Sequence, residues 1–337
     1  FEFYRYEDII KKEDDAGYDK TAFEKMLEIK GDSDHTKLID MLTDLNDYSI
    51  GIEDVLKEHF DEENIVYWMA FQILMGNVDT QNRNVYLYSP LNSDIWYFIA
   101  WDNDGCLMRP EYELRNFSDQ NSWEKGISNY WGNILFQRCL KSRSFREKLN
   151  DAILDLREYL NKDMLTSKIE TYKNVLKPYL YLMPDAEYEP LTSEQYDQIA
   201  ASLPDEIEKN YQLYLESLET PMPFYIGVPT IDGDKLKFNW DVSYDLDAED
   251  ITYSVEVAGD YLFRDVIYQN TTLTVPEAEM DLPKAGQYFV RVRATNTSGK
   301  TQDAFDYYVT DEGKYYGMRC FYITEDSTVE EDDYEEG

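Results

Sequence analysis

The stretch that decides the fold is Asn77-Val-Asp79-Thr-Gln-Asn-Arg-Asn84-Val-Tyr-Leu-Tyr88, followed by Ile95-Trp-Tyr-Phe-Ile-Ala-Trp101-Asp102-Asn-Asp104-Gly105. Asp79 is followed five positions later by Asn84, and Asp102 opens a second acidic turn. Between them, two runs rich in aromatic and β-branched residues flank a turn sequence, Ser89-Pro-Leu-Asn-Ser93. The sequence therefore predicts a β-hairpin over 84–101 that brings Asp102 back beside Asp79.

A helix is predicted immediately before this stretch, over residues 61–75. Asp61 suits the N-cap, and Glu62 and Glu63 suit the positive end of the helix dipole. Gly76 suits the end of the helix. Because the segment is apolar nearly all round, we expect it at the centre of a core.

The rest of the chain divides into a helical part and a β part. Residues 1–75 and 133–218 show the apolar spacing of helices, with Asp34 a candidate cap and 141–160 and 193–218 the clearest segments. Glu219-Thr-Pro-Met-Pro223 is a break in composition that predicts a linker. Strands are predicted at 235–240, 251–257, 271–275 and 286–294, a spacing typical of a sandwich.

We therefore expect an α+β protein with a helical domain over 1–218, a linker over 219–223 and an all-β sandwich over 224–312. Residues 313–337 are expected to form a C-terminal extension, whose acidic tail from residue 325 is predicted to be disordered.

The charge of the chain restricts its partners. The 337 residues carry 69 acidic and 32 basic side chains, for a formal net charge of −37. The charge argues against nucleic acid and anionic membrane surfaces as partners, because their phosphates would be repelled. No apolar run reaches the length that a transmembrane helix requires. The positive implication is attraction for divalent cations.

Few residues are available for classical metal or nucleophile chemistry. Cys106, Cys139 and Cys320 form no Cys-x-x-Cys pair, so a zinc knuckle is excluded, and three buried thiols are favoured over a disulfide. The presence of only His35 and His59 argues against a histidine metal site or a Ser-His-Asp triad. Catalysis would have to rely on carboxylates, amides or a supplied cofactor.

The spacing of Asp79, Asn84 and Asp102 matches the order in which kinases place their phosphate-transfer groups, D-x-x-x-x-N and then a metal-binding Asp after a hairpin. Asp79 could accept the proton of an attacking hydroxyl. The amide oxygen of Asn84 and the carboxylate of Asp102 are hard ligands of the kind magnesium prefers, and Asp104 is either a second ligand or a solvated turn residue. Asn and Asp are also common in plain turns, so the argument rests on the coincidence of helix, motif, hairpin and acidic turn.

These motifs resemble the spore-coat CotH kinase family of atypical, secreted protein kinases. The resemblance rests on Asn-x-Asp-x-x-x-x-Asn from Asn77, Tyr-Leu-Tyr, Trp101-Asp-x-Asp, and the later Trp131-Gly-Asn-Ile-Leu-Phe and Phe145-Arg-Glu-Lys-Leu, and it covers roughly residues 1–180. It implies a kinase-like fold, ATP and magnesium as cofactors, and Ser or Thr of bacterial surface or coat proteins as substrate, outside the cell. It also implies Asp79 as the catalytic Asp and Asp102 as the main metal ligand, assisted by Asn84.

Two features depart from the family pattern. Arg83 stands where family members often have a His, and no Gly-rich loop or strand Lys precedes residue 60. Since the chain opens at Phe1 without Met, we expect an internal fragment that holds the large kinase lobe and lacks the nucleotide-binding lobe upstream.

Residues 224–312 resemble a fibronectin type III module. Trp240 would be its core Trp, and Tyr288-Phe-Val-Arg-Val-Arg-Ala-Thr-Asn-Thr-Ser-Gly299 matches a late strand with its turn. The resemblance implies a spacer or an adhesive unit on a bacterial surface, with the spacer favoured.

Two other functions stay open. A non-catalytic binding or scaffold protein on a kinase-like fold is the second hypothesis. A calcium-binding adhesion module that uses Asp102 and Asp104 is the third, and it ranks last because Asp102-x-Asp104-Gly105 lacks the form of an EF-hand loop.

Overall fold

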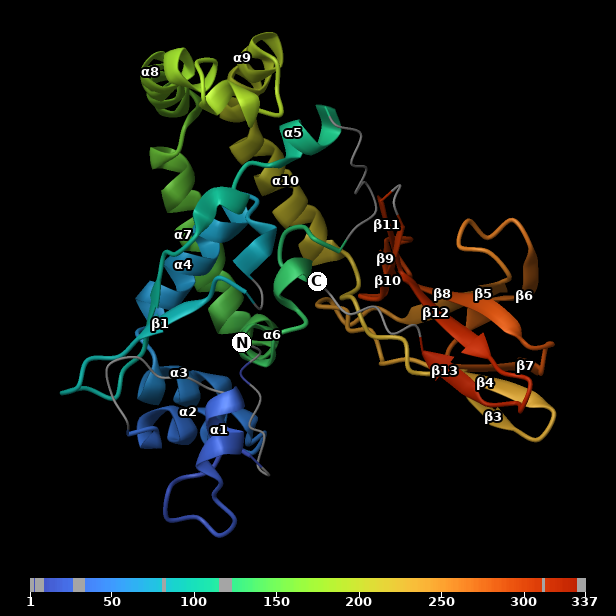
Figure 1. Ribbon diagram of the computed structural model, residues 1–337. Helices are drawn as coiled ribbons and strands as arrows, with labels where there is room; N and C mark the ends of the chain where they lie inside the picture. The colour runs from blue at the N-terminus through green and yellow to red at the C-terminus, as the bar shows by residue number, and fades with distance from the viewer. Residues whose placement is uncertain are drawn as a thin grey trace. The chain divides into compact units, whose positions relative to one another are not determined.

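The computed structural model describes residues 3, 9–26, 34–80, 83–114, 123–310 and 313–331. The chain forms two compact units, shown in Figure 1. Unit 1 comprises residues 1–107 and 130–208, and unit 2 comprises residues 108–129 and 209–337. The protein is α+β, because unit 1 is mainly helical and unit 2 is mainly antiparallel sheet.

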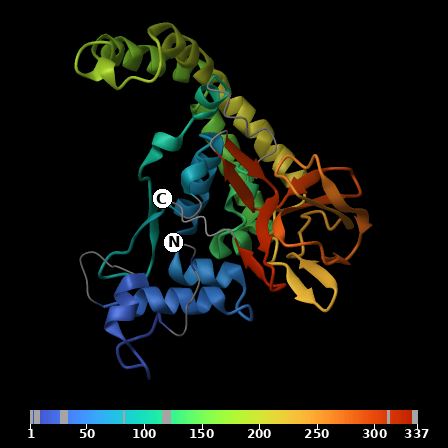
Figure 2. The ribbon, with the colours of Figure 1, turned by 45° about the vertical axis from the view of Figure 1, so that its right-hand side comes forward.

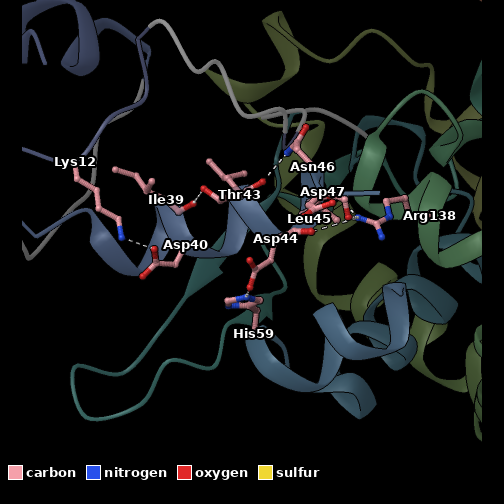
Figure 3. Close-up of polar contacts among 11 residues, drawn as sticks. Lys12, Ile39, Asp40, Thr43, Asp44, Leu45, Asn46, Asp47, His59 and Arg138 are labelled. Atoms are coloured by element: carbon pink, nitrogen blue, oxygen red, sulfur yellow. Dashed lines mark hydrogen bonds and ion pairs between the residues drawn. The ribbon is translucent and has the colours of Figure 1, made fainter. Parts of the chain in front are cut away.

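Unit 1 begins with α1 (Lys20–Met26), α2 (Thr36–Asn46) and α3 (Ile52–His59). The N-cap of α2 is His35, although the predicted cap, Asp34, accepts a hydrogen bond from the amide of Thr36 at 2.9 Å. At the other end of α2, the buried guanidinium of Arg138 donates to the carbonyl of Leu45, as Figure 3 shows. A cation at a helix C-terminus satisfies carbonyls that have no partner within the helix.

A polar contact joins α2 and α3 in the same region. Asp44 Oδ2 lies 2.7 Å from Nε2 of His59, which is buried (Figure 3). On the outer side of α2, Lys12 pairs with Asp40 at 2.6 Å. These contacts fix the position of α2 beside the rest of unit 1.

Helix α4 (Glu62–Leu74) is the central helix of unit 1, as its composition predicts. The Asp61 side chain caps it by accepting the amide of Asn64 at 2.9 Å. Gly76, with φ of 60°, follows the end of the helix in the left-handed conformation that glycine tolerates best. The helix packs against α7 (Arg143–Tyr159) and buries side chains on nearly every face: Ile65, Val66, Trp68, Met69, Ala70, Gln72, Ile73 and Leu74.

The predicted hairpin is confirmed as β1 (Tyr86–Tyr88) paired antiparallel with β2 (Tyr97–Ile99). Its inner face carries Phe98, which is 3% exposed and lies between the rings of Phe60 and Trp68 at 6.1 and 4.7 Å. This aromatic cluster attaches the hairpin to α4, so α4 positions both ends of the segment between residues 77 and 105.

The later helices of unit 1 are α6 (Ile134–Lys141), α7, α8 (Lys162–Leu180) and α9 (Ser193–Ser202). The predicted single helix over 193–218 is wrong, because the 3-10 turn η5 (Leu203–Asp205) separates α9 from α10 (Glu206–Glu219). Pro204 lies in that turn, and proline removes a helical hydrogen bond and clashes with the preceding turn. In Figures 1 and 2, α8 and α9 lie at one end of unit 1 and α1–α3 at the other, with α4 between them.

Unit 2 contains a three-stranded and a six-stranded antiparallel sheet. The first has the order β3-β4-β7, and the second has the order β13-β12-β8-β5-β6, with β9 also paired to β8. The strands are β3 (Thr230–Asp232), β4 (Lys235–Asn239), β5 (Ile251–Ala258), β6 (Val266–Leu273), β7 (Glu277–Asp281), β8 (Gly286–Asn296), β9 (Thr301–Asp303), β12 (Met318–Ile323) and β13 (Val329–Glu331). The two sheets share one core that contains Phe238, Val255, Val292 and Trp240, the last as the sequence predicts.

The β structure extends past residue 312. A two-stranded sheet joins β10 (Tyr307–Thr310) to β11 (Gly313–Tyr316), and β12 then pairs with β8 along its whole length. Four of the six side chains of β12 are buried, Phe321 completely, so this strand belongs to the core of the sheet. The expectation of disorder from residue 325 is wrong for Val329–Glu331, which pair with β12, whereas 332–337 lie outside the described residues.

Helix α5 (Arg109–Leu114) and residues 123–129 belong to unit 2. Arg109 donates to Asn210 at 2.8 Å, and Trp123 Nε1 donates to the carbonyl of Phe305 at 3.0 Å. These long-range contacts place a segment from the middle of the chain in the unit formed by the C-terminal residues. In the described ranges, no helix combines the length and apolarity needed to cross a membrane.

Candidate active site

A buried network of amide side chains holds the inner side of the loop that follows α4. Asn77 is 2% exposed, and its Nδ2 donates to Gln72 Oε1 at 3.0 Å and to Asn103 Oδ1 at 3.3 Å. Gln72, fully buried on α4, donates to the same oxygen of Asn103 at 3.1 Å. The end of α4 and the loop that follows it are therefore joined to the turn at Asn103, 26 residues further along the chain, by neutral polar groups that satisfy one another.

A second set of contacts holds the 3-10 turn η1 (Val78–Thr80). The Tyr130 hydroxyl donates to the carbonyl of Asn77 at 3.3 Å and lies 3.1 Å from the hydroxyl of Thr80. Thr80 is fully buried and Tyr130 nearly so. The turn is consequently fixed on its inner side, while Asp79 at its middle faces solvent.

Asp79 and Asn84, the two ends of the predicted motif, are in direct contact. Asn84 Nδ2 donates to Asp79 Oδ2 at 2.7 Å, and the amide of Asp79 donates to Asn77 Oδ1 at 3.2 Å. The motif residues Gln81 and Asn82 lie outside the described residues. The five-residue spacing therefore brings the carboxylate of Asp79 and the side-chain amide of Asn84 together.

The acidic turn after β2 packs against this loop. Asp102 precedes the 3-10 turn η2 (Asn103–Gly105), and both Asp102 and Asp104 are exposed. A Cβ placed on Gly105 would lie 2.8 Å from Asn77 Oδ1 and 3.4 Å from Asp79 Cβ, so glycine permits the close approach. The structure thereby brings the turn of Asp102 and Asp104 beside Asp79, as the hairpin predicts.

Backbone strain is concentrated in the same segment. Asn84, Asp102 and Leu107 have positive φ angles of 53°, 49° and 57°. Asn and Asp tolerate this region, but a leucine there is strained, and the amide of Leu107 is held by the carbonyl of Met75 at 2.8 Å. Strained residues of this kind persist where the surroundings over-determine them, which is typical of active sites.

The surroundings of the site shift the pKa of the neighbouring Cys106 thiol. Burial, and to a smaller extent the charge of Asp104, raise the pKa of the Cys106 thiol to about 12, although a hydrogen bond with Asn77 acts in the opposite direction. Cys106 is therefore a neutral thiol at physiological pH, which excludes it as a nucleophile.

The oxygen ligands present fit magnesium in type. Asp79, Asp102 and Asp104 offer carboxylates and Asn84 an amide oxygen, the hard donors that magnesium takes. Among the residues that the structure describes, no group of three or more His, Cys, Asp or Glu side chains is placed to hold a metal ion. The donor set suits magnesium that binds through one or two protein ligands together with phosphate oxygens.

The outer face of the hairpin is aromatic and exposed. Tyr86 and Trp101 are 45% and 55% exposed, and their rings stack with centroids 5.2 Å apart. Tyr88 and Ile99, both exposed, belong to the same face, because residues opposite each other in an antiparallel pair point to the same side. An apolar face therefore borders Asp102, which follows Trp101 directly.

Three residues of this site are missed by reasoning from the sequence. Gln72 is a polar residue in an otherwise apolar stretch of α4, which is a usable signal for a buried contact. Asn103 lies inside the quoted motif, but the motif assigns it no role. Tyr130 carries no signal, because it lies 50 residues from Thr80 and thirty tyrosines occur in the chain.

A groove between α4 and α7 lies apart from this site. Its lining includes Glu62, Tyr67, Lys148 and Asp155, and it contains none of the motif residues. Lys148 pairs with Glu62 at 2.6 Å, and Tyr67 donates to Asp155 at 2.9 Å. These contacts partly satisfy the polar groups of the groove within the chain itself.

Comparisons with known proteins agree with the motif. A family model described as CotH kinase protein matches residues 2–214. No protein with a curated description matches the chain. Among solved structures, surface layer protein SbsC, domains 1–6, is similar at 13% identity and a TM-score of 0.17, a score that carries no argument about the fold. The match covers 88% of this chain and 38% of that chain.

Proposed function

The chain belongs to the CotH kinase protein family, and from this premise we propose that it transfers the γ-phosphate of ATP to Ser or Thr hydroxyls of other proteins. The observation that carries the proposal is the hydrogen bond between Asp79 and Asn84 with Gly105 packed against Asp79, because it unites the two halves of the motif. The order of helix α4, loop, hairpin and acidic turn supports a kinase large lobe.

Asp79 is the proposed catalytic residue. Its carboxylate is exposed and is anchored through the backbone amide, so it can accept a hydrogen bond from an approaching hydroxyl and orient it. The bond from Asn84 Nδ2 holds one carboxylate oxygen and leaves the other for the acceptor substrate. Little covalent work is required of the protein in phosphoryl transfer, and such positioning supplies most of the catalysis.

Asn84, Asp102 and Asp104 are the proposed ligands of magnesium, which when bound would neutralise charge on the phosphates of ATP. Asp102 and Asp104 have no hydrogen-bond partner among the described residues, so both carboxylates are available. The left-handed backbone of Asp102 and the packing of Gly105 fix the direction of the turn. Asp102 is assigned the main role because the turn begins there.

The stacked rings of Tyr86 and Trp101 are proposed to contact the adenine base. A planar base gains from stacking on aromatic faces, and these rings are exposed beside Asp102. We further propose, from the family, that the substrates are surface or coat proteins and that the protein acts outside a bacterial cell. The sheets of unit 2, from residue 224 through β13, are proposed to be a fibronectin type III-like spacer.

Transfer of label from γ-labelled ATP with magnesium tests the proposal, with autophosphorylation and a Ser/Thr-rich protein as acceptors. The wild type is compared with Asp102→Ala, and with Asp94→Ala as the matched control. Asp94 is an exposed carboxylate in the loop of the same hairpin, outside the site. We expect incorporation by the wild type and the control and its loss in Asp102→Ala.

Two outcomes contradict the proposal. Equal incorporation by Asp102→Ala would remove that residue from the site. No incorporation by the wild type, together with no measurable ATP binding, would favour the non-catalytic scaffold. A comparison of the binding affinities for magnesium and calcium separates the kinase and scaffold hypotheses from the calcium-adhesion hypothesis. Only the calcium-adhesion hypothesis expects calcium to bind more tightly than magnesium.

A further inference from the structure

The acidic turn after β2 has one inward side chain between two outward ones. Asn103 is half-buried, whereas its neighbours Asp102 and Asp104 are exposed. Asn103 Oδ1 accepts hydrogen bonds from Gln72 Nε2 at 3.1 Å and from Asn77 Nδ2 at 3.3 Å. Neither aspartate has a side-chain hydrogen bond in the described part of the chain. Asn103 is therefore the residue through which the side chains of this turn are attached to unit 1.

The attachment of Asn103 uses only its oxygen. A carbonyl oxygen has two lone pairs, and the two donors occupy both of them. The nitrogen Nδ2 has no hydrogen-bond partner among the residues that the structure describes. A rotation of this amide by half a turn would bring three NH₂ groups together, so the donors on Gln72 and Asn77 fix its orientation.

These side-chain bonds are additional to those that end helix α4. Main-chain bonds already satisfy the last turn, where the amide of Gly76 donates to the carbonyl of Ile73 at 3.1 Å. The amide of Asn77 donates in the same way to the carbonyl of Gln72 at 3.0 Å. The contact that the side-chain amides add is the one between the end of α4 and the acidic turn.

Asn77 extends the same network to the loop of Asp79. Its Oδ1 accepts the amide of Asp79 at 3.2 Å, while its Nδ2 donates to Asn103. A Cβ on Gly105 would lie 2.8 Å from Asn77 Oδ1, so the turn and the loop approach each other closely at this side chain. A displacement of Asn103 therefore removes a partner of Asn77, and Asn77 in turn holds the backbone of Asp79.

We propose that Asn103 is a positioning residue for phosphate transfer. Its inward attachment holds Asp102 and Asp104 outward. Through Asn77, it also keeps Asp79 in a fixed position relative to these two carboxylates. The inference rests on the proposed function, because positioning matters only if the carboxylates act on ATP and magnesium. Hydrogen bonds from outside the metal ligands orient those ligands, and their loss typically weakens metal binding or activity by about 10- to 100-fold.

Two substitutions at residue 103 test the proposal. Asn103→Ala removes the acceptor, whereas Asn103→Asp keeps an oxygen for both donors, and Asn92→Ala in the exposed hairpin loop is the matched control. Electron paramagnetic resonance of Mn²⁺, which takes the same oxygen ligands as magnesium, measures metal binding with a non-hydrolysable ATP analogue. We expect Asn103→Ala to weaken Mn²⁺ binding by about 10- to 100-fold. Asn103→Asp should not weaken it, because the oxygen remains and the added charge attracts the cation.

Hydrogen exchange in the chain without ligands tests the link to Asp79. The amide of Asp79 should exchange roughly 2- to 13-fold faster in Asn103→Ala, the range that one lost hydrogen bond gives, and near the wild-type rate in Asn103→Asp. The amide of Met69, in the middle of α4, should keep its rate, whereas a role confined to overall stability would accelerate both. Gln72→Met removes an amide from α4 without altering the turn, and it should act in the same direction to a smaller extent because Asn77 still donates to Asn103.

The outcomes separate this inference from the proposed function. Equal Mn²⁺ binding by the wild type and Asn103→Ala would overturn the positioning role. Equal losses in Asn103→Ala and Asn103→Asp would also overturn it, since the acceptor oxygen would not be the cause. Unchanged exchange at Asp79 in Asn103→Ala would overturn the link through Asn77. A wild type that binds neither Mn²⁺ nor the ATP analogue would contradict the proposed function itself, and the positioning role with it.

Discussion

The inner and outer faces of the β1–β2 hairpin use the same kind of side chain in opposite surroundings. On the inner face, Phe98 is 3% exposed and packs into the aromatic cluster around α4. On the outer face, Tyr86 and Trp101 stack on each other and stay 45% and 55% exposed. Burial explains the inner face completely. It does not explain the outer face, and that is why the outer face and the carboxylates beside it form the candidate active site.

The largest expected effect is on the outer side, at Asp79. Asp79→Asn keeps the shape and the acceptor for Asn84 but removes the charge, so kcat for phosphate transfer should fall by about 10²–10⁴-fold, or roughly 3–5 kcal/mol in the barrier. The free energy of unfolding should change by no more than about 0.5 kcal/mol, because the side chain is exposed. Initial rates at saturating ATP and a urea titration measure the two quantities. A kcat within threefold of the wild type would contradict the assignment.

On the inner face, the expected effect is on stability. Phe98→Ala should lower the free energy of unfolding by about 3–5 kcal/mol, because it leaves a cavity in a packed cluster. Tyr86→Ala, the matched change on the outer face, should cost about 0.5–1.5 kcal/mol, the worth of one aromatic pair. Urea unfolding followed by the helical circular dichroism signal compares them. Equal losses would show that the two faces do not differ as described.

Substitutions in the buried amide network should also lower stability, but by less than substitutions on the inner face of the hairpin. Asn77→Ala leaves Gln72 and Asn103 short of a donor, so it should destabilise unit 1 by about 1–3 kcal/mol. The amide of Asp79 also loses its acceptor, so its hydrogen exchange should accelerate. Asn92→Ala, in the exposed hairpin loop, is the control and should change neither. Unaltered exchange at Asp79 in Asn77→Ala would show that the network does not hold the loop.

The smallest effect is expected for nucleotide binding on the outer face. Tyr86→Ala removes one stacking partner worth about 0.5–1.5 kcal/mol, so KM for ATP should rise by about 2- to 13-fold with kcat within twofold. The exposed Tyr159→Ala on α7 serves as the control. If KM stays constant while kcat falls, the ring positions the reacting groups and does not bind the base.

Much of the segment that forms the site is predictable from the sequence. The cap at Asp61, the end at Gly76, the hairpin and the pairing of Asp79 with Asn84 are all confirmed. The spacing also predicts that Asp102 returns beside Asp79, and Gly105 packs there. The assignment of Asp79, Asn84, Asp102 and Asp104 to catalysis and magnesium stays a prediction, as does the fibronectin type III assignment of the sheets.

Other elements are predicted less well, and each has a physical cause. One proline, Pro204, causes the break between α9 and α10. The apolar periodicity continues across this proline, so the pattern alone predicts one helix. The strand β12 lies beyond the predicted end of the sandwich, and because side chains on both of its faces are buried, it lacks the clear alternation that marks a half-buried strand. Segment 108–129 joins unit 2 through contacts such as Trp123 with Phe305, which no local pattern encodes.

The sequence by itself determines where α4 begins and ends, the hairpin that follows it, and the order of the acidic residues, because caps, turns and alternation act over a few residues. The tertiary structure alone decides that Gln72, Asn77 and Asn103 share one network and that Tyr130 closes over Thr80. It also decides that one face of α8 stays exposed. Such contacts depend on which surfaces meet after the chain has folded, and a side chain that is 26 or 50 residues away leaves no trace in local spacing.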